Sequence, residues 1–278
     1  MKLRSLLFVP GDRPERFAKA VASGADALIL DLEDSVSLTN KSIAREAVAN
    51  WLLTEPSLPC FVRVNPLDGG LVDDDLAAIL PASPYGLVLP KAEGAPTVRT
   101  LIEKMSQKAL PILPIASETP AAIFQMGSYA EVRDHLAGLT WGAEDLPAAI
   151  GASAAREADG RYTPPIELAR SLTLFAAHAA GTRAIETVYP NFRDLEGLAA
   201  YVARARRDGF SGMMAIHPSQ VAVINDGFSA TVEEINRAKA IIAAFAEHPD
   251  AGVLQLDGKM IDKPHLKLAQ FLLSQAGE

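Results

Sequence analysis

The feature that most limits the fold of this chain is a series of short apolar runs, many of them bounded by glycine, proline or acidic residues. Between Val9 and Ile216 the ends of these runs lie on average about 30 residues apart, the length of a βα unit. Such runs are typical of strands buried on both faces of a parallel sheet. The eight runs are Ser5–Val9, Ala27–Asp31, Cys60–Val64, Gly86–Leu89, Leu110–Ala116, Leu139–Gly142, Arg183–Val188 and Gly212–Ile216.

Helical patterns fill the intervals between these runs, over Pro14–Ser23, Lys41–Leu53, Asp73–Leu80, Ala95–Lys108, Pro120–Met126, Ile166–Ala180 and Leu195–Asp208. Eight alternating βα units predict an α/β fold, a (β/α)8 TIM barrel. We expect the barrel core over residues 1–225. Residues 226–278 are predicted to form a C-terminal helical extension and tail that pack on the barrel or on a neighbouring subunit. A longer interval predicts an exposed excursion around residues 148–165.

Composition narrows the possible partners. The net charge of −8 and the pI near 5.2 argue against nucleic acid, which requires a basic face. A single cysteine, Cys60, excludes an internal disulfide framework and suits a reducing compartment. No apolar run approaches the roughly 18 residues of a membrane span. We therefore expect a cytoplasmic protein without a membrane or nucleic-acid partner.

Polar and charged residues follow nearly every predicted strand. The active site of a barrel lies at the carboxyl ends of its strands, so these residues are expected to converge there. In strand order they are Pro10, Gly11, Asp12 and Arg13; Asp31, Glu33 and Asp34; Arg63 and Asn65; Lys91; Glu118; Glu144 and Asp145; Glu186; and His217.

The acidic members of this set point to a divalent metal. Glu118 and Asp145 offer the oxygen ligands that Mg²⁺ prefers and leave positions open for substrate. A bound Mg²⁺ polarises a carbonyl as a Lewis acid. The three acids after the second strand repel one another and would hold metal-bound waters. Arg63 carries a planar fork of donors that suits a substrate carboxylate or an enolate-like oxygen.

Simpler structural roles stay open for these groups. Glu118 and Asp145 each precede a predicted helix and would serve as helix caps. The acids within Asp31–Asp34 would instead form an ion-pair network with Arg63 and Lys91.

The basic residues also allow two interpretations. Arg13, Arg16 and Lys19 form a basic island in an acidic protein, which suggests a phosphate site, but they would equally form the solvated face of a helix. His217 would contact substrate, or would only fix the turn before Pro218.

Eight segments, taken in order, resemble the citrate lyase beta subunit-like family, which includes the malyl-CoA and citramalyl-CoA lyases. No single segment is specific, but together they cover almost the whole chain. They are Leu7–Phe17, Leu30–Val36, Val62–Pro66, Leu89–Lys91, Glu118–Thr119, Gly142–Leu146, Ala215–Gln220 and Lys259–His265.

The resemblance implies a TIM-barrel enzyme that cleaves a carbon–carbon bond with Mg²⁺ as its cofactor. Glu118 and Asp145 would bind the ion, and Glu33 and Asp34 would support it through water. Arg63 would stabilise the enolate of the acyl thioester. The reaction would split a malyl-, citramalyl- or citryl-type β-hydroxyacyl-CoA thioester into an acyl-CoA and a small 2-oxo acid.

The same resemblance implies how substrate and subunits come together. The basic first loop would lie near the phosphates of CoA or of an acyl carrier. Asp262 in the tail would reach the site of a neighbouring subunit as acid or base, which implies a homo-oligomer, a trimer. The residues implied in substrate or CoA binding are Pro10, Arg13, Arg16, Lys19, Lys91, Asn65 and His217.

Three other functions stay open on the sequence. They are the beta subunit of a citrate lyase complex, a malyl-CoA thioesterase, and a non-catalytic scaffold that binds acyl-CoA or metal. The joint presence of Arg63, Glu118, Asp145 and Asp262 argues against the scaffold. Glu186 departs from the resemblance, because the family often has aspartate there.

Overall fold

The computed structural model describes residues 2–106 and 109–277. The chain divides into two compact units, Leu3–Gly227 and a second unit formed by Phe228–Glu278 with Met1–Lys2. Each unit is described by itself below. The predicted helix end at Lys108 lies outside the described residues.

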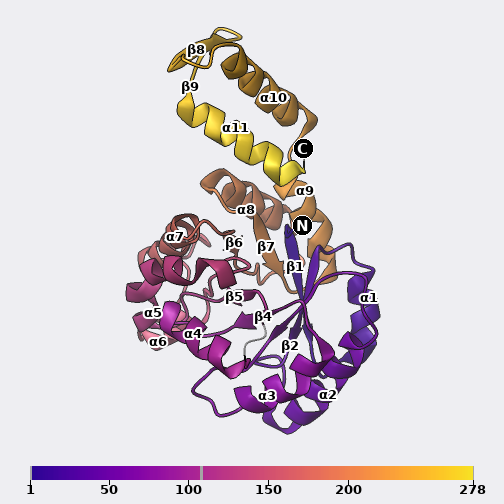
Figure 1. The fold of residues 1–278 in the computed structure, drawn as a ribbon. Helices are drawn as coiled ribbons and strands as arrows, with labels where there is room; N and C mark the ends of the chain where they lie inside the picture. Colours follow the sequence, from indigo (N-terminus) through magenta and orange to yellow (C-terminus); the bar gives the residue numbers. More distant parts are fainter. Residues whose placement is uncertain (1, 107–108, 278) are drawn as a thin grey trace. The chain divides into compact units, whose positions relative to one another are not determined.

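The larger unit is built on a curled, seven-stranded parallel sheet with helices on its outer side (Figure 1). The strand order is β5-β4-β3-β2-β1-β7-β6. Strands that follow each other in the chain are neighbours, as short βα connections favour, except β5 and β6, which lie at the two edges of the sheet. The strands are β1 Ser5–Pro10, β2 Ala27–Asp31, β3 Cys60–Arg63, β4 Gly86–Leu89, β5 Ile112–Pro114, β6 Ile185–Glu186 and β7 Gly212–Ala215.

The helices follow the predicted segments closely, and α8 has the predicted bounds. The α-helices of this unit are α1 Phe17–Val21, α2 Lys41–Leu52, α3 Val72–Ile79, α4 Ala95–Lys104, α5 Pro120–Gln125, α6 Asp145–Ala149, α7 Pro164–Ala179, α8 Leu195–Asp208 and α9 Pro218–Phe228. Short 3-10 helices are η1 Pro14–Arg16, η2 Leu38–Asn40, η3 Leu80–Ala82 and η4 Met126–His135. None of the described helices has the length and apolar character needed to cross a membrane.

The predicted strand Leu139–Gly142 is reduced to isolated bridges. The Thr140 amide donates to the Pro114 carbonyl (3.0 Å), and the Leu139 amide donates to the Arg183 carbonyl (2.8 Å). Single residues thus pair with the ends of β5 and β6 without a continuous ladder. One reason is that Pro114, the last residue of β5, has no N–H to extend the pairing.

A single apolar cluster on one face of the sheet receives side chains from every strand. Because strand side chains alternate, residues two apart point to the same face. Asp31 therefore follows Ile29 on this face, and Arg63 follows Phe61. The buried members are Leu3, Leu6, Ala27, Ile29, Phe61, Val88, Leu113, Ile115, Ile185 and Met214. The charged side chains appear where the apolar face ends, at the carboxyl ends of the strands.

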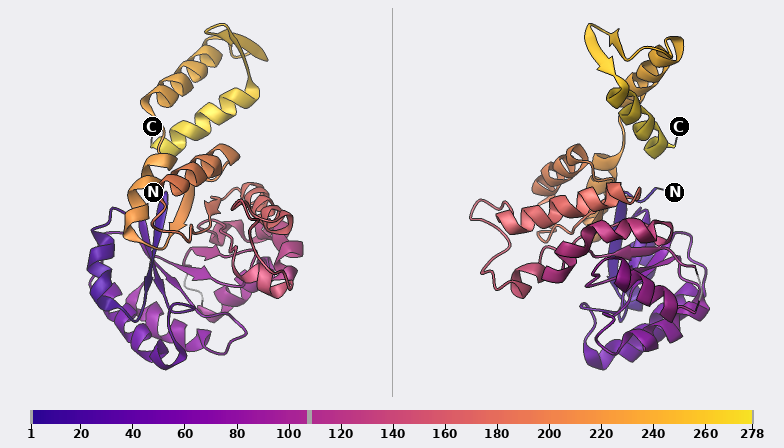
Figure 2. Two further views of the ribbon diagram at one scale, coloured as in Figure 1. Left: turned by 180° about the vertical axis from the view of Figure 1, so that it is seen from behind. Right: turned by 60° about the vertical axis from the view of Figure 1, so that its left-hand side comes forward.

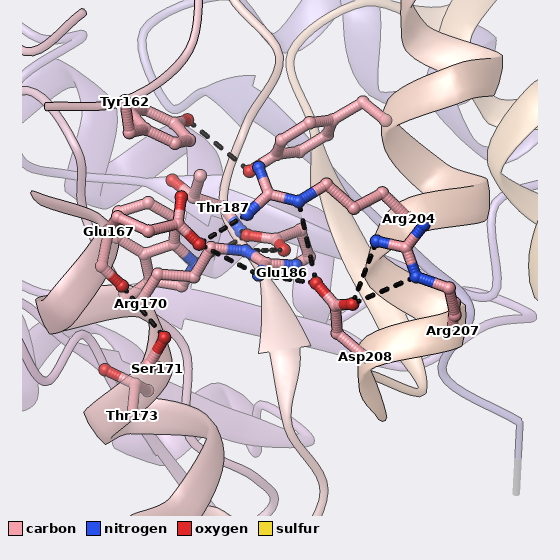
Figure 3. Close-up of polar contacts among 12 residues, drawn as sticks. Tyr162, Glu167, Arg170, Ser171, Thr173, Glu186, Thr187, Arg204, Arg207 and Asp208 are labelled. Carbon is pink, nitrogen blue, oxygen red and sulfur yellow. Dashed lines mark hydrogen bonds and ion pairs between the residues drawn. The ribbon is translucent and has the colours of Figure 1, made fainter. Parts of the chain in front are cut away.

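A buried ion-pair network joins β6 to α7 and α8 (Figure 3). Fully buried Glu186 accepts hydrogen bonds from Trp141 Nε1 (2.5 Å) and Arg170 Nε (2.8 Å), and Arg170 Nη1 also donates to Asp208 (2.8 Å). Burial raises the pKa of Glu186, against the opposing effect of Arg170. Glu186 follows a strand, as predicted, but its carboxylate is used within the protein.

The excursion between α6 and α7 has no regular secondary structure apart from one bridge, Arg156↔Tyr162. It is mostly exposed, as expected. Buried Tyr162 anchors the excursion. Its ring centroid lies 5.2 Å from the ring centroid of Trp141 and 4.1 Å from the guanidinium carbon of Arg156.

The C-terminal unit consists of α10 Val232–Glu247, a hairpin of β8 Val253–Leu256 and β9 Lys259–Asp262, and α11 Lys263–Ala276 (Figure 2). The sequence predicts a helical extension and tail over residues 226–278, and the structure adds a hairpin between the two helices. Asp257 and Gly258 form its two-residue turn with φ of 50° and 75°. Asp-Gly is the sequence signal for such a turn. The core of the unit is Ala238, Ile241, Phe245, Ile261 and Ala269.

Candidate active site

Strand register brings the first two charged residues of the site together. In the parallel pairing of β2 with β3, Asp31 lies opposite Arg63. The guanidinium binds the carboxylate with two parallel bonds, Nε to Oδ1 and Nη2 to Oδ2, both 2.7 Å. Nη1 lies 2.9 Å from Glu33 Oε2, and the Phe8 ring lies 4.8 Å from Cζ. Two of the five N–H groups donate to Asp31, and the contact with Glu33 is an ion pair without a hydrogen bond, which leaves the other N–H groups for a ligand.

Burial and charge fix the ionisation of this pair. Burial raises the pKa of Asp31, but its bonds to Arg63 outweigh burial and lower the pKa overall. Asp31 is therefore ionised at neutral pH and holds the guanidinium in one orientation. Burial raises the pKa of Glu33, and the charges of Arg63 and Lys91 oppose that rise.

Lys91 joins the ends of three further segments. Its ammonium lies 3.0 Å from Glu33 Oε1 and 3.5 Å from Asp145 Oδ1 at the start of α6. Its main-chain N–H donates to Glu118 Oε2 at 2.6 Å. The strand ends thus bring six side chains together, and we call Asp31, Glu33, Arg63, Lys91, Glu118 and Asp145 the strand-end cluster.

Glu118 has a raised pKa within the strand-end cluster. Its side chain is buried, and burial raises its pKa to about 8, with further contributions from the nearby charges of Asp145 and Glu33. It does not cap α5, because Thr119 does so by accepting from the Ala122 amide (3.1 Å). The carboxylate is therefore not used as a helix cap.

Gly142 makes room for this carboxylate. A Cβ placed on Gly142 would lie 2.9 Å from Glu118 Cγ and 3.0 Å from Oε1. Any other residue would push the acid out of place, so the Gly142-Ala143-Glu144-Asp145 segment requires glycine at its first position.

The composition of the strand-end cluster fits a hydrated divalent cation. Asp31 and Arg63 balance each other, which leaves the carboxylates of Glu33, Glu118 and Asp145 against the single ammonium of Lys91. Across the described part of the chain there is no group of three or more metal-ligating side chains. Proteins usually hold Mg²⁺ with one or two carboxylates, and water and substrate oxygens complete its coordination.

A second layer of buried polar groups supports the acidic turn after β2. Buried Lys41 donates to the Leu32 carbonyl (2.6 Å), the Glu33 carbonyl (2.8 Å) and Asn65 Oδ1 (2.7 Å). The Asn65 side chain also donates to Asp75 Oδ2 (2.7 Å). The side chain of Asn65 is thus occupied within the protein, and its predicted contact with substrate stays a prediction.

Sequence reasoning missed Lys41 and Asp75. A signal existed for Lys41, because it is the first residue of α2, where the helix dipole disfavours a cation and no acid compensates it in the first turn. Asp75 lies among three consecutive aspartates in the first turn of α3, and only its burial distinguishes it from the others.

The predicted basic residues lie on the loop after β1 and on the short helices η1 and α1 that follow it. The Gly11 amide donates to the Asp31 carbonyl (2.8 Å), and a Cβ on Gly11 would lie 2.6 Å from that oxygen, so the loop lies tightly against the end of β2. Arg13 lies 3.8 Å from Asp12, and Arg16 lies 3.9 Å from Glu15, as loose surface pairs. Lys19 and these two arginines are exposed, while Pro10 ends β1.

The remaining predicted residues lie at the edge of the strand-end cluster or outside it. His217 follows β7, stacks on Phe192 (4.7 Å between centroids) and contacts Ser219 Oγ (2.8 Å), so it does shape the turn into α9. Asp34 is exposed, and its charge contributes to the raised pKa of Glu33.

Asp262 belongs to the C-terminal unit, where it caps α11. Its carboxylate accepts from the His265 amide (3.4 Å), and its Oδ1 lies 2.5 Å from His265 Nδ1. The hydrogen bond from the His265 side chain lowers the pKa of Asp262.

The fold and the cluster are typical of α/β enzymes that act at the carboxyl ends of parallel strands. The sequence model of the HpcH/HpaI aldolase/citrate lyase family matches residues 4–218. The chain therefore belongs to this family, which confirms the resemblance stated from the motifs.

Individual relatives agree with this assignment. The chain is 37% identical over 276 residues to a citrate lyase subunit beta-like protein of Mycobacterium tuberculosis, covering 98% of this chain and 95% of the relative. It is 33% identical over 290 residues to the mitochondrial citramalyl-CoA lyase of Homo sapiens, with 96% and 83% covered. The crystal structure of CitE from M. tuberculosis with magnesium, acetoacetate and coenzyme A superposes with a TM-score of 0.82 at 36% identity, covering 99% of this chain and 98% of that one.

Proposed function

We propose that this protein is a Mg²⁺-dependent carbon–carbon lyase acting on a β-hydroxyacyl-CoA thioester of the malyl, citramalyl or citryl type. The observation that carries the proposal is the strand-end cluster, in which a fixed arginine fork lies beside an excess of carboxylates. The similarity to citramalyl-CoA lyase and to a CitE structure that holds magnesium and coenzyme A supports the substrate class.

The cleavage is a retro-aldol reaction. A base removes the proton of the β-hydroxyl, the carbon–carbon bond breaks, and the electron pair moves onto the thioester carbonyl as an enolate. The free N–H donors of Arg63 stabilise this developing negative charge, since Asp31 holds the fork in place before reaction. Protonation of the enolate carbon then gives the acyl-CoA. When bound at Glu118 and Asp145, Mg²⁺ supplies a Lewis acid for the 2-oxo acid.

The substrate contacts are also proposals. Arg13, Arg16 and Lys19 would bind the phosphates of CoA, because these exposed basic side chains follow β1 within a few residues of Gly11, whose amide donates to the Asp31 carbonyl. The rest of the substrate would be contacted by the other residues predicted to bind it, Pro10, Lys91, Asn65 and His217. Glu33 and Asp34 would support the ion through water.

We propose two structural features that complete the enzyme. Leu139 and Thr140, which bridge to β5 and β6, would close the sheet as a (β/α)8 barrel. We also place the protein in the cytoplasm, because it has one cysteine and an acidic composition.

Asp262 is proposed to act as acid or base at the site of a neighbouring copy, within a homotrimer. Asp262→Asn protein should be inactive alone, and Arg63→Ala protein should be inactive alone. Mixed under conditions that exchange subunits, the two should regain part of the wild-type rate, because some sites then contain both intact residues. No recovery in mixtures of differently tagged subunits that native mass spectrometry shows to be hybrid would contradict the proposal.

A lyase assay tests the proposed function directly. The purified protein with Mg²⁺ is given malyl-CoA, citramalyl-CoA and citryl-CoA, and the released oxo acid is trapped. We expect one thioester to yield glyoxylate, pyruvate or oxaloacetate together with its acyl-CoA. Free CoA and a hydroxy acid without an oxo acid would show a thioesterase instead.

The same assay, with a citryl-carrier substrate added to the panel, tests the main alternative, the beta subunit of a citrate lyase complex. That alternative has support, because the chain is 36% identical to the citrate lyase subunit beta of Haemophilus influenzae, covering 98% of that protein. Turnover of a citryl-carrier substrate, with no turnover of any CoA thioester, would favour it.

A further inference from the structure

We propose that Lys91 is a positioning residue that sets how tightly the strand-end cluster binds a divalent cation. Its main-chain amide orients one carboxylate, and its ammonium occupies two others as an internal counter-ion. The inference rests on the proposed magnesium site and assigns Lys91 a role that substrate contact alone would not require.

The backbone of Lys91 adopts a conformation that side chains disfavour. Its φ is 49°, in the left-handed region that residues other than glycine and asparagine rarely occupy. Two contacts of the next residue, Ala92, hold the turn: its amide donates to the Ile115 carbonyl (3.3 Å), and its carbonyl accepts from the Tyr129 hydroxyl (3.2 Å). Strain maintained in this way is characteristic of functional positions.

The strained turn directs the Lys91 amide at the metal-binding acid. The N–H donates to Glu118 Oε2 at 2.6 Å, so one oxygen is fixed by a main-chain dipole. Gly142 leaves space beside Oε1, the other oxygen. A fixed carboxylate loses little conformational entropy on binding a cation, so this contact favours binding.

The ammonium of Lys91 acts in the opposite direction. It lies 3.0 Å from Glu33, whose side chain is 4% exposed, and 3.5 Å from Asp145, whose side chain is 36% exposed. A cation bound to Asp145 would compete with the Lys91–Asp145 contact, which is the longer and more exposed of the two. The buried Lys91–Glu33 contact would stay in place. The lysine charge therefore weakens cation binding through direct repulsion and through competition for Asp145.

The two effects separate in a matched pair of substitutions. Lys91→Gly removes the ammonium and tolerates positive φ, so the amide still reaches Glu118. Lys91→Val removes the same ammonium, but its β-branched side chain disfavours positive φ and pulls the amide away. The difference between the two variants reports the backbone, and the difference between Lys91→Gly and wild type reports the charge.

Magnesium affinity, measured by isothermal titration calorimetry without substrate, gives the test. Lys91→Gly should bind Mg²⁺ about tenfold more tightly than wild type. Lys91→Val should bind about tenfold more weakly than Lys91→Gly. If the valine variant does not fold, Lys91→Asn and Lys91→Thr give the same comparison, because asparagine tolerates positive φ and the β-branched threonine disfavours it.

Ser83 provides the control, since its φ of 53° lies in a turn at the end of η3, outside the strand-end cluster. Ser83→Gly and Ser83→Val should change thermal stability and leave magnesium affinity unchanged. Equal affinity of wild type, Lys91→Gly and Lys91→Val would overturn the inference while leaving the proposed function intact. Wild-type protein that binds no Mg²⁺ would overturn both.

Discussion

Glu118→Ala and Asp145→Ala proteins are expected to stay folded and to lose magnesium binding, with affinity at least about 100-fold below wild type. The estimate follows because loss of even an outer-shell partner costs 10–100-fold, and these two acids are the proposed direct ligands. Removing Glu118 also relieves its repulsion with Asp145 and Glu33, which contributes to its raised pKa. The fold should therefore survive the change.

Calorimetry with Mg²⁺, beside circular dichroism for the fold, measures this effect. Glu118→Gln is the sharper variant, because the amide oxygen still accepts from the Lys91 N–H while the charge is lost. Glu144→Gln is the matched control, since it removes a carboxylate next to Asp145 that is not a proposed ligand; its affinity should stay within about threefold of wild type. Retained affinity in Glu118→Ala or Asp145→Ala would place the metal site elsewhere.

Arg63→Lys is expected to lower kcat/KM for the thioester about 100- to 1,000-fold, the usual effect of losing an oxyanion donor. The ammonium keeps the charge, but it cannot bind Asp31 with two parallel bonds and also present directed N–H groups to an enolate. Magnesium affinity should change little, because Arg63 is paired with Asp31 and is not a ligand.

The chain contains a close control for this change. Arg4 forms a similar two-bond pair with Asp26, at 2.9 Å and 2.8 Å, at the opposite end of β1 and β2. Arg4→Lys should lose comparable stability on thermal unfolding while turnover stays near wild type. A near-normal rate in Arg63→Lys, or an equal loss of rate in Arg4→Lys, would remove Arg63 from its proposed role.

The sequence alone identified much of the molecule, because the relevant signals are local. Apolar runs alternating with helical patterns predicted the parallel strands and the helices around them, and hydrophobic burial enforces that pattern wherever it occurs. The tendency of polar residues to follow these runs predicted which residues would gather at one end of the sheet. Asp257-Gly258, which marks the hairpin of the C-terminal unit, is a clear local signal that the prediction did not use.

Tertiary structure decided which of these groups meet and in what state. Asp31 and Arg63 are 32 residues apart, and they pair because the register of β2 with β3 places them opposite each other. Lys41 supports the acidic turn only because folding buries it against two carbonyl groups. The raised pKa of Glu118 depends on burial, which no local pattern specifies. Patterns along the chain determine elements through short-range forces, whereas charge pairing and desolvation depend on distances that only the folded chain sets.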